Sequence, residues 1–307
     1  MIQAIIDIGS NTVRMALYEI SDNKIEFLMK KKHLVGLAAY LENNIMSDKG
    51  IEKLCEVLRE FQGFLEIFKI DNLVTFATAA VRNCDNSPEV VAKIYRRTGI
   101  KVQIISGDQE ADYDFIGATR NVQDTKGILA DIGGGSTELV YYENGQHLHK
   151  ISLPMGSLAF KTKYCSEVLP NKYELDLMLQ EARRMVATAQ DFDQIKGDTL
   201  CGIGGTFKGL RGIYNAQYNQ GEENFEIPAS CIGEIINHFS NSDALNQQDA
   251  ILLMINVPDR IHTIFPGLAI AQVLVEKFQC KKIIYSDSGV REGYIYSEII
   301  KDEKNNQ

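Results

Sequence analysis

Short apolar runs alternate along the chain with longer stretches in which apolar residues recur every three or four positions. The short runs predict buried strands, and the longer stretches predict amphipathic helices. Residues 2–8, 13–20 and 24–32 are therefore expected to form three successive strands. Ser47 is a suitable N-cap for a helix that continues to about Phe68.

The same reading assigns most of the remaining chain. Further strands are expected at 73–77, 101–105, within 127–153, at 199–203 and at 281–286, and further helices at 87–98, 108–119, 172–190, 207–214, 231–239, 244–255, 266–278 and 290–300. The polar residues 215–229 are expected to be an exposed loop, and 302–307 a polar tail. Strands that alternate with helices in this way predict an α/β fold.

One stretch, Gly127 to Tyr142, has the pattern of a β-hairpin with an unusually bare tip. Glycine allows backbone N–H groups to approach an anion closely, and the tip consists of Gly133, Gly134, Gly135 and Ser136. Asp131 and Glu138 flank this tip, so a divalent cation could lie between the two carboxylates and a bound phosphate. The alternative is a purely structural hairpin with surface acids.

Residues 4–19 repeat this pattern without gaps. Asp7 aligns with Asp131, Arg14 aligns with Glu138, and Ser10 and Asn11 occupy the tip. An internal repeat determines the architecture, so we expect two similar α/β lobes with a ligand-binding cleft between them. In this interpretation the residues of both tips donate hydrogen bonds to phosphate oxygens.

Composition sets limits on the function. The 307 residues are enough for two domains, and 45% of them are hydrophobic. Six scattered cysteines without a Cys-x-x-Cys pair argue against a disulfide framework or a zinc site. We find no signal-like or membrane-spanning apolar run, which predicts a cytoplasmic protein without a membrane partner.

The net charge of −9 argues against nucleic-acid binding. The longest basic run, Lys30 to Lys32, is interpreted as a solvated strand end. A polyanionic substrate would need local cations and metal to hold it against this overall charge. Arg14 and Arg82 are the expected phosphate ligands, because a guanidinium matches phosphate geometry; a salt bridge is the alternative for each.

Two further features are less decisive. Gly204, Gly205 and Thr206 form a strand-to-helix turn that suits either an anion or simple packing. His147 and His149 alternate on a predicted strand, so they should share one face and are interpreted as surface residues. Arg291 and Glu292 could line the cleft or anchor the last helix.

Six segments together resemble the exopolyphosphatase/guanosine pentaphosphate phosphatase (Ppx/GppA) family of the actin–hexokinase–Hsp70 superfamily. They are Asp7-Ile-Gly-Ser-Asn-Thr-Val-Arg14, Ala77-Thr-Ala-Ala-Val-Arg82, Ser106-Gly-Asp-Gln-Glu-Ala111, Asp131-Ile-Gly-Gly-Gly-Ser-Thr-Glu138, Gly202-Ile-Gly-Gly-Thr206 and Ser286-Asp-Ser-Gly-Val-Arg-Glu-Gly293. They follow the family's order over nearly the whole chain. The resemblance implies two ribonuclease H-like lobes: 1–120, with the helix 290–301 packing back on it, and 121–289.

The resemblance also implies hydrolysis of a terminal phosphoanhydride with Mg²⁺ or Mn²⁺. Glu110 would be the catalytic carboxylate that positions water, and Asp7, Asp131 and Glu138 would be the acids linked to the metal. Gln109 stands where the family often has a second acid, and Thr12 stands where Ser is usual. Longer members continue into a helical C-terminal region, so processive action on long chains is not implied here.

The resulting hypothesis is an exopolyphosphatase that acts on inorganic polyphosphate, with short chains expected to be the substrate. Guanosine pentaphosphate is the alternative substrate. A phosphotransferase and a polyphosphate-binding regulator without turnover are less favoured, and a homodimer is left open by the family resemblance.

Overall fold

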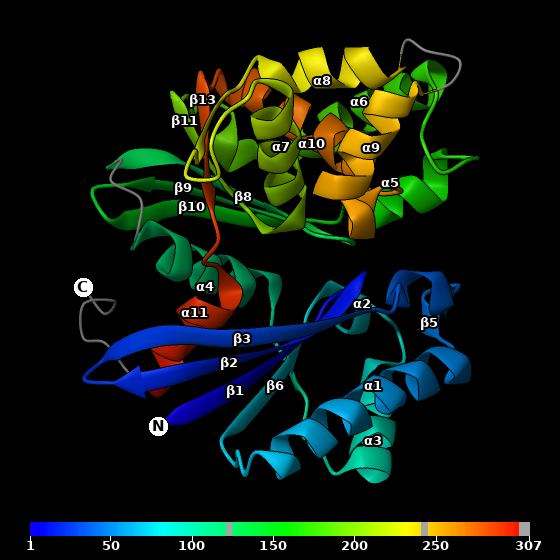
Figure 1. Ribbon diagram of the computed structural model, residues 1–307, viewed down its shortest axis with the longest axis vertical. Helices are drawn as coiled ribbons and strands as arrows, with labels where there is room; N and C mark the ends of the chain where they lie inside the picture. Colours follow the sequence, from blue (N-terminus) through cyan, green and yellow to red (C-terminus); the bar gives the residue numbers. More distant parts are fainter. Residues whose placement is uncertain (121–124, 241–244, 301–307) are drawn as a thin grey trace. The chain divides into compact units, whose positions relative to one another are not determined.

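The computed structural model describes residues 1–120, 125–240 and 245–300 (Figure 1). The chain forms two compact units, each built around its own mixed β-sheet. The first unit comprises Met1–Glu110 and the segment from Tyr294 onward, and the second comprises Ala111–Gly293. The chain therefore changes units within helix α4 (Gly107–Thr119) and again within α11 (Val290–Tyr294). The predicted tail 302–307 lies outside the described residues.

The first unit has a five-stranded sheet in the order β3-β2-β1-β6-β7. Its strands are β1 (Ile2–Ile8), β2 (Thr12–Ser21), β3 (Lys24–Leu34), β6 (Leu73–Ala77) and β7 (Gln103–Ile104). The strands β1, β6 and β7 are parallel, whereas β2 and β3 are antiparallel to their neighbours. The three N-terminal strands are confirmed, but β7 is shorter than the predicted strand 101–105.

Helices cover one face of this sheet through residues that recur with helical spacing. The helical elements are η1 (Leu37–Tyr40), α1 (Asp48–Ile67), α2 (Ala79–Arg82) and α3 (Ser87–Thr98), and β4 (Leu41–Glu42) pairs with β5 (Ile45–Met46). Ser47 caps α1, as predicted, by accepting a hydrogen bond from the Gly50 N–H. The predicted helix 87–98 is confirmed as α3, with Asn86 at its N-cap position.

The second unit repeats the arrangement of the first. Its strands are β8 (Lys126–Ile132), β9 (Thr137–Glu143), β10 (Gln146–Leu153), β11 (Thr199–Ile203), β12 (Glu226–Pro228) and β13 (Lys282–Ser286), in the order β10-β9-β8-β11-β13-β12. Apart from the edge strand β12, order and direction match the first sheet. This duplication confirms the predicted α/β fold with two ribonuclease H-like lobes. The predicted loop 215–229 was wrong in part, because β12 lies within it.

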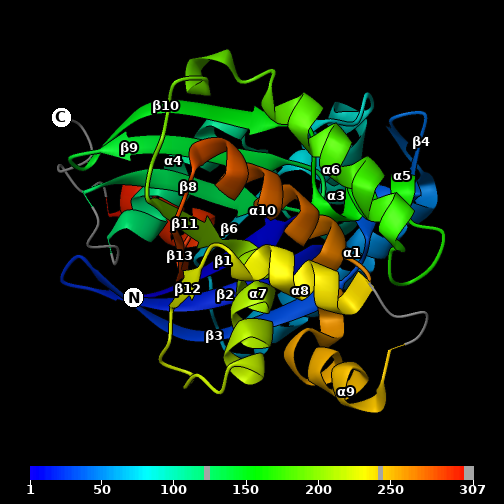
Figure 2. The same ribbon diagram turned by 90° about the horizontal axis from the view of Figure 1, so that it is seen from above.

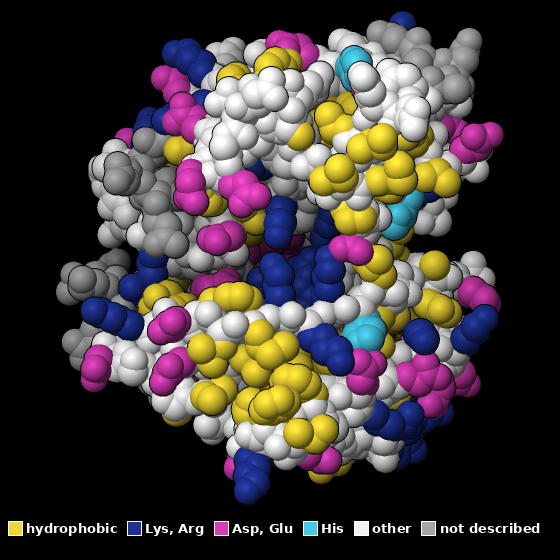
Figure 3. All heavy atoms as spheres, in the orientation of Figure 1, with side chains coloured by type: hydrophobic (Ala, Val, Ile, Leu, Met, Phe, Trp, Pro, Cys, Tyr) yellow, Lys and Arg dark blue, Asp and Glu magenta, His cyan; other side chains and the backbone are white. Residues whose placement is uncertain are grey.

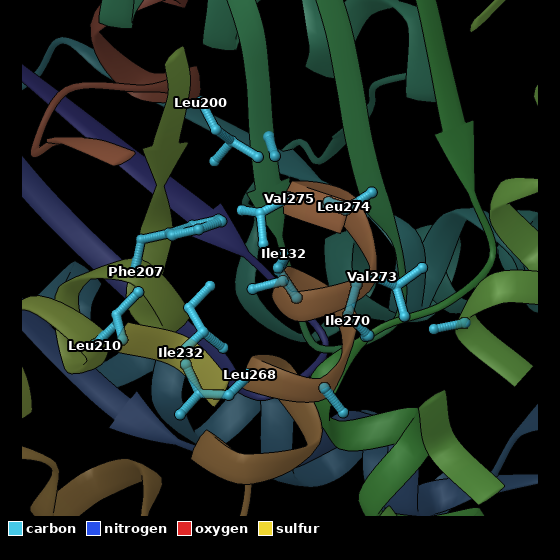
Figure 4. Packing of buried hydrophobic residues seen from close by; sticks show 14 of the residues in the cluster. Ile132, Leu200, Phe207, Leu210, Ile232, Leu268, Ile270, Val273, Leu274 and Val275 are labelled. Carbon is cyan, nitrogen blue, oxygen red and sulfur yellow. The ribbon is translucent and has the colours of Figure 1, made fainter. Parts of the chain in front are cut away.

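Helix α10 forms the centre of the second unit's core and packs against α5, α6, α7 and α8 (Figures 2 and 4). The helical elements are α5 (Ser157–Tyr164), α6 (Lys172–Val186), η2 (Gln190–Phe192), α7 (Gly204–Gln217), α8 (Cys231–Ser240), α9 (Gln247–Asn256), η3 (Pro258–Arg260) and α10 (Ile264–Phe278). Of these, α5 was not predicted, and α7 begins three residues before its predicted start.

The C-terminal helical segment differs from its prediction. Residues 295–299, predicted as α-helix, have a π-helical hydrogen-bond pattern after α11. Tyr294 belongs to the first unit, where its ring stacks on Phe76.

All six cysteines are free thiols. None of the helices in the described part of the chain combines the length and apolarity needed to cross a membrane.

The prediction that His147 and His149 share a face was wrong. A register shift between them inserts an extra residue into β10. His147 therefore lies against Phe115 of α4, whereas His149 packs against Phe192 in the core formed with α6 and α10. A β-bulge of this kind reverses the alternation on which the prediction depended.

Candidate functional site

The tip of the first hairpin is a tight turn at the end of β1. The Gly9 N–H donates to the carbonyl of Thr12, and a Cβ at Gly9 would lie 3.2 Å from the same oxygen. The carbonyl of Asn11 accepts from the N–H groups of Val35 and Gly36. Ser10 and Asn11 are buried, and the Asn11 side-chain Nδ2 has no hydrogen-bond partner among the described residues. An unpaired buried donor costs stability, which supports the predicted ligand role of Asn11.

Asp7 and Arg14 face each other across this hairpin. They are directly paired in the β1–β2 register, and Arg14 Nη1 lies 3.6 Å from Asp7 Oδ2. Asp7 is buried, whereas about a quarter of the Arg14 side chain is exposed (27%). The two residues predicted as metal ligand and phosphate ligand thus form an ion pair within one hairpin.

The second predicted arginine contacts the predicted catalytic acid. Arg82 ends α2, and its Nη1 donates to Glu110 Oε2 at 2.6 Å and to the carbonyl of Ile105 at 3.2 Å. Glu110 lies in the first turn of α4 and is 8% exposed. The arginine therefore fixes the orientation of a nearly buried carboxylate.

A capping box holds the turn that carries Glu110. The Gln109 N–H donates to Ser106 Oγ at 3.1 Å, and the Ser106 N–H donates to Gln109 Oε1 at 2.9 Å. Reciprocal bonds of this kind stabilise a helix start. Gln109 therefore has a structural role. The spacing Ser-x-x-Gln is a known signature of this motif, so the sequence contained the signal.

The tip of the second hairpin repeats the geometry of the first. The Gly133 N–H donates to the carbonyl of Ser136 at 2.9 Å, matching the bond from Gly9 to Thr12. The carbonyls of Gly133 and Gly134 accept bonds from the first turn of α5, which begins at Ser157. Within the described part of the chain, the N–H groups of Gly134 and Gly135 have no acceptor. These donors are suitable ligands for an anion.

The two acids that flank this tip lie side by side. Asp131 on β8 and Glu138 on β9 are directly paired, which places them on the face of the sheet that α4 covers. Ser152 Oγ donates to Glu138 Oε1 at 2.7 Å, and Glu138 is 1% exposed. Two neighbouring carboxylates suit Mg²⁺, which commonly combines one or two such ligands with water and substrate oxygens.

The turn that starts α7 lies against Asp131. Gly204 has a φ of 78°, and a Cβ there would lie 2.4 Å from Asp131 Oδ1. Thr206 Oγ1 donates to the carbonyl of Ile132 at 3.3 Å. The structure therefore brings the predicted residues of the second unit together: the glycine tip, Asp131 and the N-terminus of α7.

One cation at this turn has no signal in the sequence. The guanidinium of Arg260 lies directly over Gly205, where a Cβ would come within 1.8 Å of Arg260 Cζ. Arg260 is separated from Gly205 by most of α7, α8 and α9, so the sequence contained no local signal. Its position adds a guanidinium to the helix N-terminus, which already favours anions.

Two further observations concern Glu292 and the acidic side chains. The Gly289 N–H donates to Glu292 Oε2 at 2.9 Å, so Glu292 caps α11. Among the described residues, no group of three or more His, Cys, Asp or Glu side chains is arranged to enclose a metal. A metal bound by Asp131 and Glu138 would therefore depend on substrate and water for its other ligands.

The chain matches a family sequence pattern and is similar to several known proteins. The sequence pattern of the Ppx/GppA phosphatase family matches residues 16–302. A Haemophilus influenzae protein provisionally named an exopolyphosphatase is 28% identical over 306 residues, which cover 96% of this chain and 90% of that protein.

Two further proteins are similar over nearly the whole chain. The guanosine-5'-triphosphate,3'-diphosphate pyrophosphatase of Pseudoalteromonas atlantica is 26% identical over 312 residues, and the match covers 99% of this chain but 60% of that enzyme. The crystal structure of the Aquifex aeolicus member of the Ppx/GppA family superposes with a TM-score of 0.76 at 25% identity. That match covers 98% of both chains.

Proposed function

The chain belongs to the Ppx/GppA phosphatase family, and we propose that it is an exopolyphosphatase that releases orthophosphate from the end of inorganic polyphosphate. The observation that carries this proposal is the bond between Arg82 and the nearly buried carboxylate of Glu110. A carboxylate held in one orientation can accept a hydrogen bond from water and direct that water at a phosphorus atom.

The proposed reaction requires little activation of the nucleophile. Phosphoryl transfer proceeds largely by dissociation in most analyses, so correct water placement and charge neutralisation supply most of the catalysis. In this proposal Glu110 positions the water. The proposed phosphate ligands are Arg14, Arg82 and the first hairpin tip in the first unit, and Arg260 and the second hairpin tip in the second unit.

Mg²⁺ is the proposed cofactor, with Mn²⁺ as the alternative. Asp131 and Glu138 would hold it from the second unit, because their carboxylates are paired on neighbouring strands. The ion would neutralise charge on the transferred phosphate when bound. Asp7, the equivalent acid of the first repeat, is proposed as a further metal-linked acid, although it is already paired with Arg14.

Guanosine pentaphosphate is the second candidate substrate. It is favoured by the similarity to the Pseudoalteromonas enzyme, whereas the similarity to the Haemophilus protein favours polyphosphate. Both compounds end in a phosphoanhydride, so the residues proposed above would serve either.

The test is phosphate release from tripolyphosphate, long polyphosphate and guanosine pentaphosphate by the wild type and by Glu110→Gln. Removing a positioned general base typically costs roughly 10²- to 10⁴-fold in rate, so the variant should lose at least about 10²-fold in kcat. The preferred substrate of the wild type identifies the activity. Addition of EDTA should abolish release, and Mg²⁺ should restore it.

Asp108→Asn is the matched control, because Asp108 lies in the same helical turn but is exposed. It should release phosphate like the wild type. Equal, low release by the wild type and Glu110→Gln, with tight polyphosphate binding, would contradict the proposal and indicate a binding protein. Net ATP formation from ADP and polyphosphate would indicate a phosphotransferase.

A further inference from the structure

Helix α4 belongs to both units, and the residue proposed to position water lies where the helix passes from one to the other. Glu110 ends the N-terminal part of the first unit, and Ala111 begins the second unit. Both lie within the continuous helix Gly107–Thr119. Contacts that fix α4 on the second unit therefore also fix the backbone that carries the Glu110 carboxylate.

Apolar packing holds α4 against the sheet of the second unit. Ala111, Phe115 and Ala118 pack on buried residues of β8, β9 and β11. Burial of apolar surface has no preferred direction. A polar contact with a defined geometry therefore fixes the helix more closely than this packing does by itself.

Asp112 supplies such a contact in the first residues of the second unit. Lys150 Nζ donates to both carboxylate oxygens of Asp112, at 2.8 and 2.6 Å. Lys150 lies on β10, an edge strand of the second sheet. From the same strand, His147 Nε2 lies 3.7 Å from Asp112 Oδ1, and the His147 ring meets Phe115 edge-on. Two side chains of β10 thus hold two residues of α4.

The pair of Lys150 and Asp112 is better protected from water than the ion pairs of the outer surface. Figure 3 shows Lys and Arg side chains beside Asp and Glu side chains at several places on the surface. In the exposed pair of Lys281 and Asp198 the side chains are 77% and 72% exposed, and pairs of this kind contribute little to stability. The side chains of Lys150 and Asp112 are only 26% and 31% exposed, so their attraction is screened less.

Two charge pairs therefore hold α4 within three consecutive residues. In the first unit Arg82 is bonded to Glu110, and in the second unit Lys150 is bonded to Asp112. The two acids are two residues apart, which is about 3 Å along the helix axis. A shift of Asp112 is therefore transmitted directly to the backbone of Glu110.

From these contacts we infer that Lys150 is a positioning residue for the proposed hydrolysis, because it fixes α4 through Asp112. The inference rests on the proposed function, in which Glu110 positions the attacking water. Lys150 is not one of the proposed phosphate or metal ligands. Its loss should therefore disturb the placement of the water and leave the affinity for substrate unchanged.

The kinetic test compares Lys150→Gln with the matched control Lys126→Gln. Lys126 lies on β8 of the same sheet, and its Nζ lies 3.6 Å from Glu143 Oε1 on the neighbouring strand β9. We expect Lys150→Gln to lower kcat roughly tenfold, because small misplacements of a catalytic group are costly, and KM to stay close to the wild-type value. Lys150→Arg should keep most of the activity, because a guanidinium can also bind both oxygens of a carboxylate. Lys126→Gln should keep the wild-type kcat.

Combination with Glu110→Gln separates positioning from general damage to the fold. Residues that act as a unit have non-additive effects, so adding Lys150→Gln should not lower the residual rate of Glu110→Gln any further. An additional loss in the double variant, or a wild-type kcat in Lys150→Gln, would overturn the inference but not the proposed function. Full activity of Glu110→Gln would contradict both.

Amide hydrogen exchange tests the structural step without turnover. Residues 108–115 should exchange faster in Lys150→Gln than in the wild type and in Lys126→Gln, because the helix opens more easily when the ion pair is lost. Unchanged exchange in this segment would contradict the anchoring of α4 by Lys150, whether or not phosphate is released.

Discussion

Two glycines with the same backbone conformation show how a single residue shapes the site. Gly204 and Gly145 both have a φ of 78°, but a Cβ at Gly204 would meet the Asp131 carboxylate, whereas Gly145 is open. We expect Gly145→Ala to cost roughly 1 kcal/mol from backbone strain alone. Gly204→Ala should cost about 1–3 kcal/mol more, because the side chain must displace Asp131.

Urea denaturation of both variants measures the difference, and phosphate release measures its effect on the site. Gly204→Ala should lose most of its activity under native conditions, whereas Gly145→Ala should not. If the two variants lose the same stability and activity, the contact between Gly204 and Asp131 has no part in the site.

At the residue scale the sequence identified the polar groups but not their partners. Arg14 and Arg82 were predicted as phosphate ligands, with a salt bridge as the alternative. The structure shows ion pairs of Arg14 with Asp7 and of Arg82 with Glu110. Both descriptions are compatible, because a guanidinium has five N–H donors and can bind a carboxylate and a phosphate together.

At the scale of elements, the start of α4 connects helix stability with catalysis. Ser106→Ala removes one bond of the capping box, which should destabilise the protein by about 1 kcal/mol. Glu110 follows directly in the same turn, so its carboxylate should lose its fixed position. We expect kcat to fall roughly tenfold, because small misplacements of catalytic groups are costly.

The cap of α1 offers a control. Ser47 Oγ accepts from the Gly50 N–H at 3.4 Å, and α1 carries none of the proposed site residues. Ser47→Ala should cost comparable stability and leave phosphate release unchanged. Thermal unfolding and steady-state kinetics of both variants decide the matter. A parallel loss of activity in Ser47→Ala would show that general destabilisation, not the position of Glu110, limits the rate.

At the scale of the whole molecule, His262 makes folding stability depend on pH. Burial lowers the pKa of His262, and the positive charges of Lys161 and Arg260 lower it further. Near pH 6.5 His262 is therefore protonated more readily in the unfolded chain than in the folded protein. The stabilising effect of a neutral His262 is complete above pH 6.5 and is lost as the pH falls toward the folded-state pKa.

This linkage predicts a slope of at most about 1.4 kcal/mol per pH unit from one proton. Unfolding free energies of the wild type should fall between pH 7 and pH 5.5 more steeply than those of His262→Gln. Urea titrations at several pH values measure both slopes. Parallel curves would show that His262 takes up its proton equally in the folded and unfolded states.

The sequence alone determined the α/β class, the duplication and most strands. These depend on local hydrophobic period and on glycine-rich turns, which are properties of short segments. The alignment of Asp7 with Asp131 was enough to predict two hairpins with equivalent tips, and the registers of β1–β2 and β8–β9 confirm it. The capping box at Ser106 could also have been read from its spacing.

Tertiary structure alone decided which groups meet. Arg260 belongs to η3, which contacts α9, and α9 contacts α7, the helix that begins beside Gly205. These segments are far apart in the sequence, so no local pattern predicts that Arg260 lies over Gly205. A single inserted residue turned His147 and His149 to opposite faces. The lysine triplet illustrates both levels. Its sequence suggested a uniform solvated strand end, but pairing with β2 placed Lys32 beside Arg14 and Lys30 beside Ala16, and Lys31 on the other face contacts Glu60 of α1. The alternation of side chains along a strand follows from the sequence, whereas the residues that each face contacts depend on how distant segments pack.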